Sequence, residues 1–226
     1  MSDLHDVLLR TRTITFDCYG TLIDWEAGVR GSLLQIFGSA AEARAGELFD
    51  AYVQSEARIE AGPYRRYCDV LVAATRELAD QFRLTLPPDA ARLSDLLPSW
   101  TPFADTNDAL VRLKKRFRLG VLSNIDRDLF AATAGHFSVP LDFVVTAEDV
   151  RSYKPGLAHF RRMIDMEGGV EGLLHVAQSQ YHDGQAAAKL GLAFVWINRY
   201  KDPSDASVPM VAELPDLRSL AHAMDV

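Results

Sequence analysis

Four short segments carry side chains whose types and spacing could do chemistry, and the first of them is DCYGTL. It places Asp17 directly after an apolar run and continues through Gly20 and Thr21. A carboxylate in this position can act as a nucleophile that forms a covalent intermediate. We expect the backbone N–H groups of Gly20 and Thr21 to face a bound anion. Taken alone, Asp17 would more often be the N-cap of the next helix.

The other three segments would complete such a site. LSN places Ser123 and Asn124 at the end of a second apolar run, where a hydroxyl and an amide could hold an anion at a helix start. YKP places Lys154 before a proline that restricts the local backbone. QSQYHD contains Ser179 and ends on Asp183, a helix N-cap or a second active-site carboxylate. The combination is much more specific than any one segment.

The histidines near the fourth segment do not indicate a metal site. His175 and His182 are better explained as packed or hydrogen-bonded side chains, because no third ligand lies at zinc-site spacing. Gln178 cannot act as an anionic metal ligand.

These segments must be positioned by a sheet. Apolar runs rich in β-branched residues occur at 13–17, 119–124, 143–147, 173–179 and 193–198. Helical patterns lie between them at 107–117, 129–137, 157–166 and 185–190. This alternation predicts an α/β fold with a Rossmann-like parallel sheet. Ligands of such sheets bind at the carboxyl ends of the strands, where all four segments fall.

The interval between the first two strands is too long for a simple crossover and contains only helical patterns. Residues 45–62 and 68–82 are predicted helices, and Pro87-Pro88 is predicted to start another. We therefore predict two domains: a Rossmann-like core of residues 1–24 and 99–226, and a helical cap of residues 25–98 inserted after the first strand.

Composition limits the partners. The chain has 226 residues, of which 48% are hydrophobic and 24% charged, as in ordinary soluble globular proteins. Its net charge of -7 argues against binding to nucleic acid or to an anionic membrane surface. No apolar run reaches the roughly 18 residues of a membrane span. Only Cys18 and Cys68 are present and the N-terminus lacks a signal pattern, which favours a cytoplasmic location.

In their order along the chain, the four segments resemble the motifs of the haloacid dehalogenase-like hydrolase superfamily. Phosphatases of that superfamily carry a second aspartate two positions after the nucleophile and bind magnesium partly through an acid early in the fourth motif. Here those positions hold Tyr19 and Gln178. A leaving halide needs no proton, and a carboxylate substrate needs less charge neutralisation than a phosphate. The departures therefore favour the (S)-2-haloacid dehalogenase branch, whose DxYGTL pattern is similar to DCYGTL and which works without metal or cofactor.

The resemblance implies a role for each matching residue. Asp17 would attack the halogen-bearing carbon of a short 2-haloacid, release halide and become esterified, and water would then release a 2-hydroxy acid. Lys154 would pair with Asp17, Thr21 would support it, and Asp183 would orient or deprotonate the water. The implied substrate-binding residues are Cys18, Tyr19, Ser123, Asn124 and Ser179.

Dehalogenases of this branch also use a cap arginine to receive the halide. The candidates here are Arg58, Arg65 and Arg66, and any of them could instead be a solvated helix residue. The branch carries Ser-Ser-Asn in the fourth motif and a tyrosine six residues after the lysine, whereas this chain has Gln178-Ser179-Gln180 and Phe160. The family further implies a homodimer formed through the cap.

Two other functions stay open from the sequence. One is a magnesium-dependent phosphatase of a small phosphometabolite, against which Tyr19 and Gln178 argue. The other is a weakly active member of the superfamily that binds a ligand. The pairing of a nucleophile with a lysine argues against it, because a binding protein has no need for that pair. The choice of haloacid and of halogen depends on the surface of the cap.

Overall fold

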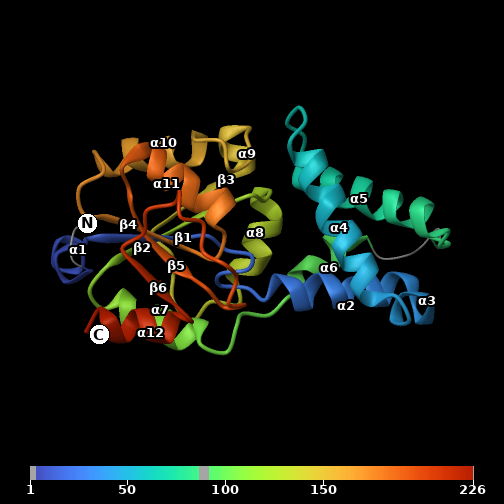
Figure 1. Ribbon diagram of the computed structural model, residues 1–226, viewed down its shortest axis with the longest axis horizontal. Helices are drawn as coiled ribbons and strands as arrows, with labels where there is room; N and C mark the ends of the chain where they lie inside the picture. Colours follow the sequence, from blue (N-terminus) through green and yellow to red (C-terminus); the bar gives the residue numbers. More distant parts are fainter. Residues whose placement is uncertain (1–3, 87–91, 226) are drawn as a thin grey trace.

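The computed structural model describes residues 4–86 and 92–225, which form a six-stranded parallel sheet with helices on both faces and a separate group of helices at one end (Figure 1). The strand order is β3-β2-β1-β4-β5-β6, and every neighbouring pair is parallel. The strands are β1 (Thr13–Phe16), β2 (Arg118–Ser123), β3 (Phe143–Thr146), β4 (Leu173–Ala177), β5 (Ala193–Ile197) and β6 (Ala212–Leu214). The predicted α/β fold class is confirmed.

Burial on both faces explains the continuous apolar runs. Every residue of β1 and of β4 is buried, as parallel strands covered by helices require. All five predicted strands are present. The sequence analysis missed β6, because this short edge strand is only partly buried and its Ala-Glu-Leu sequence contains no apolar run.

The helices on the two sheet faces follow the strands. In Figure 1, α10 and α11 cover one face of the sheet, and α7 and α12 cover the other. The four predicted crossover helices are observed within three residues of their expected bounds. The core helices are α1 (Leu4–Arg10), α7 (Thr106–Lys114), α8 (Arg127–Ala134), α9 (Ala147–Val150), α10 (Ala158–Glu167), the π-helix η2 (Gln180–Gly184), α11 (Gln185–Leu190) and α12 (Leu217–Ala223).

Helices α2 to α6 follow β1 and stand apart from the sheet in Figure 1, and we call them the cap helices. They are α2 (Trp25–Phe37), α3 (Ser39–Glu42), α4 (Ala45–Glu60), α5 (Tyr67–Phe82) and α6 (Leu93–Leu96), followed by the 3₁₀ turn η1 (Leu97–Ser99). Helices α4 and α5 pack through buried apolar faces that include Leu48, Tyr52, Val70 and Leu78. The helix start predicted at Pro87-Pro88 lies outside the described residues.

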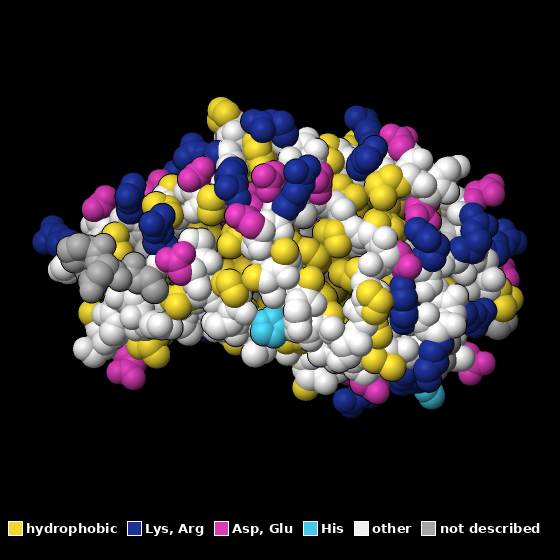
Figure 2. Space-filling model, turned by 180° about the vertical axis from the view of Figure 1, so that it is seen from behind, with side chains coloured by type: hydrophobic (Ala, Val, Ile, Leu, Met, Phe, Trp, Pro, Cys, Tyr) yellow, Lys and Arg dark blue, Asp and Glu magenta, His cyan; other side chains and the backbone are white. Residues whose placement is uncertain are grey.

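Two chain segments join the cap helices to the sheet and run side by side. The N–H of Asp24 donates to the Thr101 carbonyl at 3.0 Å, and the N–H of Phe103 donates to the Leu22 carbonyl at 3.1 Å. The indole of Trp100 is buried and donates to the Ser32 hydroxyl at 2.9 Å. On the face seen in Figure 2, hydrophobic side chains gather near the middle of the molecule, between its two ends.

The topology identifies where a ligand should bind. The direction in which the chain adds strands reverses at β1. Strands β2 and β3 lie on one side of β1, and β4, β5 and β6 lie on the other. The loops that leave the carboxyl ends of strands at such a switch point diverge and leave a crevice. Within residues 4–86 and 92–225, no helix has the length and apolar character needed to cross a bilayer.

Candidate active site

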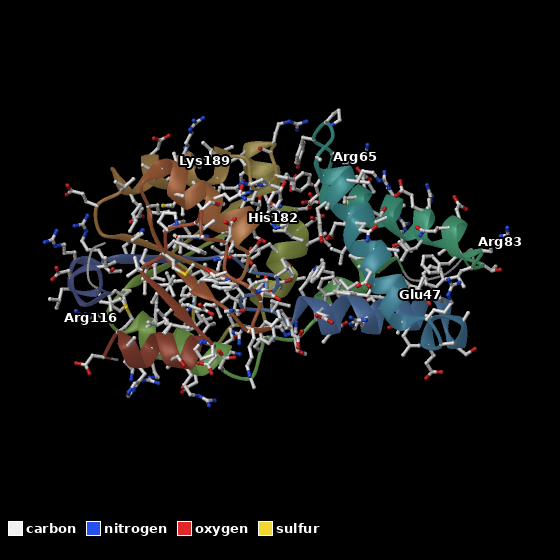
Figure 3. The ribbon with its side chains drawn as sticks, viewed as in Figure 1. Glu47, Arg65, Arg83, Arg116, His182 and Lys189 are labelled. Carbon is white, nitrogen blue, oxygen red and sulfur yellow. The ribbon has the colours of Figure 1, made fainter. Side chains whose placement is uncertain are left out.

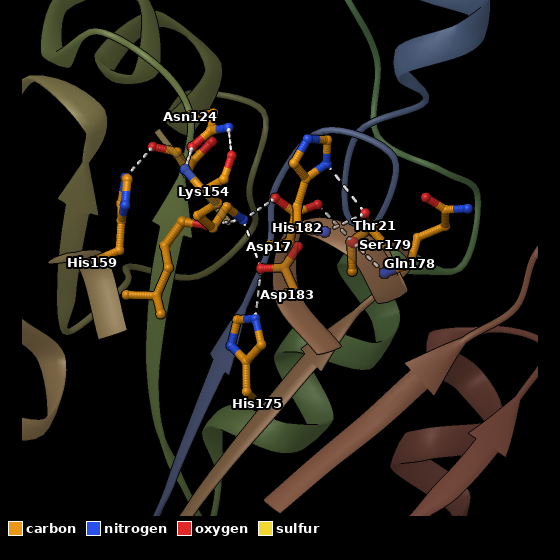
Figure 4. A network of polar contacts seen from close by, with 12 residues as sticks. Asp17, Thr21, Asn124, Lys154, His159, His175, Gln178, Ser179, His182 and Asp183 are labelled. Carbon is orange, nitrogen blue, oxygen red and sulfur yellow. Dashed lines mark hydrogen bonds and ion pairs between the residues drawn. The ribbon is translucent and has the colours of Figure 1, made fainter. Parts of the chain in front are cut away.

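The ammonium of Lys154 joins two carboxylates at the carboxyl ends of β1 and β4 (Figure 4). Its Nζ lies 2.8 Å from Asp17 Oδ1 and 2.7 Å from Asp183 Oδ1, and donates to the Leu122 carbonyl at 3.0 Å. All three ammonium N–H donors are therefore used. The structure brings together residues that are distant in the sequence, because β1, β2 and β4 are neighbours in the sheet.

Burial strengthens the charges in this network. The Lys154 side chain is 2% exposed, and burial alone would lower its pKa. The two nearby carboxylates more than offset that effect and hold the pKa of Lys154 above its usual range. Burial would raise the pKa of Asp183, but the charge of Lys154 and the hydrogen bond from His175 hold it well below its usual range. Lys154 and Asp183 are therefore both charged at neutral pH.

Thr21 fixes the other oxygen of Asp17. Its hydroxyl donates to Asp17 Oδ2 at 2.9 Å and accepts from the N–H of Gln178 at 2.9 Å, which ties the first turn to the loop after β4. Gly20 makes this turn possible with a φ of +96°, a conformation that favours glycine.

The expectation that the N–H groups of this turn face an anion was wrong. The N–H of Gly20 donates to the Ile23 carbonyl at 2.8 Å, and that of Thr21 donates to the Cys18 carbonyl at 3.3 Å. The turn uses both donors internally.

Asn124 positions Lys154. Its Oδ1 accepts from the Lys154 N–H at 2.7 Å, and its Nδ2 donates to the Lys154 carbonyl at 3.1 Å and to Glu60 Oε2 at 3.2 Å. The amide is thus occupied by protein groups. The neighbouring Ser123 hydroxyl is buried, has no partner in the described structure, and lines the same cavity as Asp17. Ser123 is therefore the available donor at the end of β2.

His175 orients Asp183. The prediction of a packed or hydrogen-bonded histidine is confirmed, but the sequence did not identify Asp183 as its partner. In the middle of β4, its Nε2 lies 2.9 Å from Asp183 Oδ1, and its Nδ1 lies 2.9 Å from the Thr15 hydroxyl. These partners suit a ring that donates from Nε2 to the carboxylate and accepts at Nδ1 from the hydroxyl. The ring packs edge-on against Phe160 at 5.0 Å. The sequence feature that could have indicated this contact is a single histidine within an otherwise apolar predicted strand, since a buried imidazole needs hydrogen-bond partners.

Tyr19 lines the cavity next to Asp17, whereas Cys18 does not. The Tyr19 hydroxyl lies 2.7 Å from the Thr133 hydroxyl of α8, and the ring lines the cavity. Burial, followed by the neighbouring charges, raises its pKa well above the usual range. Cys18 is fully buried in the core and does not line the cavity. Its contribution to the turn is its carbonyl, which accepts from the N–H groups of Thr21, Leu22 and Ile23.

The fourth motif folds as a π-helical turn, η2. The Ser179 hydroxyl accepts from the His182 N–H at 3.0 Å and begins this turn. Gln178 donates through Nε2 to Asp202, and Gln180 accepts from the Asp205 N–H. Both glutamines therefore fix the loop beyond β5. In the part of the chain that the structure describes, no group of three His, Cys, Asp or Glu side chains is arranged to hold a metal ion.

A cavity of about 350 Å³ lies between Asp17 and the cap helices. The lining residues from the cap helices are Trp25, Glu26, Phe49, Val53, Glu56, Ala57, Glu60 and Tyr67. Sequence reasoning missed Glu56 and Glu60, although their spacing of four residues beside the buried Tyr52 and Ile59 places them near one helix face.

The three candidate arginines do not line this cavity. Arg58 pairs with Glu77 in the cap helices, and Arg66 pairs with Asp126 and Asp128 beside α8. Arg65 lies in the loop between α4 and α5 (Figure 3), and its carbonyl accepts from the hydroxyl of the core residue Tyr153 at 2.9 Å. The geometry therefore provides no arginine for a halide among these three.

Known proteins match the chain in sequence and fold. An (S)-2-haloacid dehalogenase from Pseudomonas putida is 28% identical over 203 residues, which cover 85% of this chain and 86% of that protein. The structure of the L-2-haloacid dehalogenase RSc1362 is 25% identical, covers 96% of this chain and 100% of its own, and gives a TM-score of 0.82.

A likeness in fold extends to an L-2-haloacid dehalogenase from Xanthobacter autotrophicus, solved with chloropropionic acid covalently bound. It is 17% identical, with a TM-score of 0.80, and the match covers 95% of this chain and 98% of that one. The family model of the haloacid dehalogenase-like hydrolases matches residues 11–191. The chain therefore belongs to the haloacid dehalogenase-like hydrolase family.

Proposed function

We propose that this protein is a hydrolytic dehalogenase of short 2-haloalkanoic acids, with Asp17 as the nucleophile. The observation that carries the proposal is the environment of Asp17. Its carboxylate is held by Lys154 and Thr21, while the residue two positions on is a tyrosine whose hydroxyl is bonded to Thr133. That tyrosine is a poor proton donor because its pKa is raised. The site suits a leaving group that departs as a stable anion.

In the first step, a carboxylate oxygen of Asp17 forms a bond to C2 of the haloacid. The carbon–halogen bond breaks, the halide leaves with the bonding electron pair, and the configuration at C2 inverts. The Lys154 ammonium and the Thr21 hydroxyl keep the attacking carboxylate in place. The Ser123 hydroxyl, which has no partner in the described structure, would donate to the carboxylate of the substrate.

In the second step, water attacks the ester carbonyl carbon of Asp17 and the 2-hydroxy acid leaves. Asp183 suits the orientation of this water, because its Oδ2 is buried and receives no hydrogen bond in the described structure. Its low pKa makes it a hydrogen-bond acceptor rather than a strong base. His182 lines the same cavity, and burial lowers the pKa of its imidazole, which favours the neutral form that can accept the released proton.

Two relatives described above support this proposal. Both match most of this chain, and both are named as 2-haloacid dehalogenases. The test is a halide-release assay on chloro-, bromo- and fluoroacetate and on both enantiomers of 2-chloropropionate, with and without EDTA. We expect release that is selective for one enantiomer and survives EDTA, and no release by Asp17→Asn. Phosphate release that EDTA abolishes, without halide release, would instead indicate a magnesium-dependent phosphatase.

A second experiment tests the covalent route. A single turnover in oxygen-18 water, with enzyme in excess, should place the label in Asp17 and leave the product unlabelled. Label in the 2-hydroxy acid after one turnover would show that water attacks the substrate directly.

A further inference from the structure

The cap helices contribute two acidic side chains to the cavity above Asp17, and the described residues include no Lys or Arg within ion-pair distance of either. Glu56 and Glu60 lie one turn apart on α4. The third acid from the cap helices, Glu26, is paired with Arg30 at 2.7 Å. Lys154 is the one Lys or Arg among the described residues that line this cavity; it contacts Asp17 and Asp183, and its charge also acts on Glu60.

The hydrogen bonds to these two acids leave oxygens available. Glu56 accepts from the hydroxyls of Tyr52 and Tyr67, at 2.7 and 2.6 Å, and both bonds go to Oε1. Glu60 accepts from Asn124 through Oε2. In the described structure, the second oxygen of each carboxyl group receives no hydrogen bond. Burial raises the pKa of both groups, and the charge of Glu56 raises that of Glu60 further. Binding of a ligand cation would favour the ionised form of both carboxyl groups.

An independent observation indicates a ligand in the same cavity. The Ser123 hydroxyl is 1% exposed, has no partner in the described structure, and lines the cavity opposite the cap helices. It offers a donor to a carboxylate, whereas the two glutamates offer acceptors to a cation. The cavity therefore suits a ligand with opposite charges at its two ends.

The space extends beyond the first cavity. A second cavity of about 390 Å³ is lined by Tyr64, Tyr153, Tyr181 and Arg151, whose guanidinium lies over the Tyr64 ring, and it shares Glu60 and Lys154 with the first. Glu60 therefore borders both spaces. Asp17 and Glu60 line the same first cavity, so a ligand that fills it meets both side chains.

We propose that Glu56 and Glu60 bind a protonated amine on the carbon chain of the substrate, so that the preferred substrates are 2-haloacids with a terminal ammonium group. This specificity rests on the proposed dehalogenase function. The acid pair selects substrates by charge, and Asp17 carries out the displacement at the other end of the molecule.

The test compares substrates that differ only in that group. The ammonium series is 4-amino-2-chlorobutanoate, 5-amino-2-chloropentanoate and 6-amino-2-chlorohexanoate, with enzyme-free samples to subtract cyclisation. The matched series replaces the ammonium with methyl, as in 2-chloropentanoate, 2-chlorohexanoate and 2-chloroheptanoate. We expect at least one amine to exceed its methyl partner about tenfold in kcat/KM. Equal or faster turnover of every methyl partner would overturn the proposal.

Variants locate the effect. Glu60→Gln should reduce kcat/KM for the favoured amine about tenfold more than for its methyl partner. Glu47→Gln is the matched control, because Glu47 is exposed on the same helix and lies on the outer side of the cap helices (Figure 3). An unchanged preference in Glu60→Gln would contradict the assignment. If Glu60→Gln fails to fold, the comparison of substrates with the wild-type chain still decides.

A binding measurement with ligands that carry no halogen tests the cation site independently of the proposed dehalogenase activity. Calorimetry with 5-aminopentanoate and hexanoate measures the preference without any turnover. Tighter binding of the amine that is lost in Glu60→Gln, without halide release from any chloroacid, would support the cation site and reject the dehalogenase. Halide release from the methyl series without any preference for amines would do the reverse.

Discussion

At the scale of single residues, Lys154 controls the electrostatics of the site. Its three N–H donors hold Asp17, Asp183 and the Leu122 carbonyl in a buried position. Two neighbouring carboxylates would repel each other without it. In the proposed mechanism Asp17 loses its charge when it becomes an ester, and the ammonium then interacts mainly with Asp183. One cation thus serves the attacking carboxylate and the residue proposed to orient water.

Lys154→Met should damage both activity and stability. The substitution leaves two buried carboxylates without a cation, so we expect halide release to fall about 10³-fold. The free energy of unfolding should fall by about 3–5 kcal/mol, the typical effect of removing one partner of a buried ion pair. Steady-state kinetics and urea unfolding measure the two effects. A variant that keeps a tenth of the activity would show that Lys154 is not needed to position Asp17.

Glu60 should make the stability of the protein depend on pH. Burial and the charge of Glu56 raise its pKa in the folded chain, so the folded state holds this proton to a higher pH than the unfolded state. Between the two pKa values, the free energy of unfolding must therefore fall as pH rises. The Glu60→Gln variant lacks this titration and should gain stability relative to wild type from about pH 4 upward. Urea unfolding across pH 4–8 measures the difference, and parallel profiles would refute it.

At the scale of elements, a close contact between α2 and Trp100 sets how the cap helices leave the core. Gly28 lies under the indole, and a Cβ built there would be 2.5 Å from the ring. The indole N–H also bonds to Ser32 one turn later on α2. Only glycine allows this approach, because any side chain would displace the ring or the helix.

Gly28→Ala should therefore destabilise the protein by about 1–3 kcal/mol through overpacking. Gly31→Ala is the matched control on the same helix, since a Cβ there meets nothing within 4 Å. Alanine favours helix more than glycine, so the control should be neutral or stabilising by up to about 1 kcal/mol. Thermal unfolding monitored by circular dichroism compares them. Equal effects of the two substitutions would contradict the packing argument.

At the scale of the whole molecule, Asp126 connects the core to the cap helices. Its buried carboxylate follows β2 and accepts from the N–H groups of Tyr67 and Cys68, at 2.8 and 2.9 Å. These are the first residues of α5, so a core side chain caps a cap helix. Arg66 contributes an ion pair to Asp128 on α8 at the same place. The position of Glu60 above Asp17 depends on this docking.

Asp126→Ala should loosen the docking. We expect a loss of about 1–2 kcal/mol in the free energy of unfolding, the usual effect of removing an N-cap. Because the cap helices line the cavity, kcat/KM for halide release should fall about tenfold. Asp128→Ala removes an exposed partner of the same arginine and should change stability by less than about 1 kcal/mol. Equal losses in the two variants would indicate that Asp126 does not control the docking.

The sequence by itself determined five of the six described strands, the fold class and the motif residues. Asp17 and Ser123 stand at the ends of apolar runs, Lys154 and Asp183 come several residues after such runs, and parallel strands bring these positions to one edge. This inference needs only local pattern and one topological rule. It also identified Tyr19 at the position where related phosphatases carry an acid.

Tertiary structure decided which other side chains reach that edge. His175, Glu56 and Glu60 lie on a strand and a helix whose local pattern is explained by packing, so their roles depend on neighbours far away in the chain. The same holds for Arg66, which pairs with the core instead of facing the cavity. A sequence pattern gives the face of a helix, but the docking of that helix on the core fixes what the face meets.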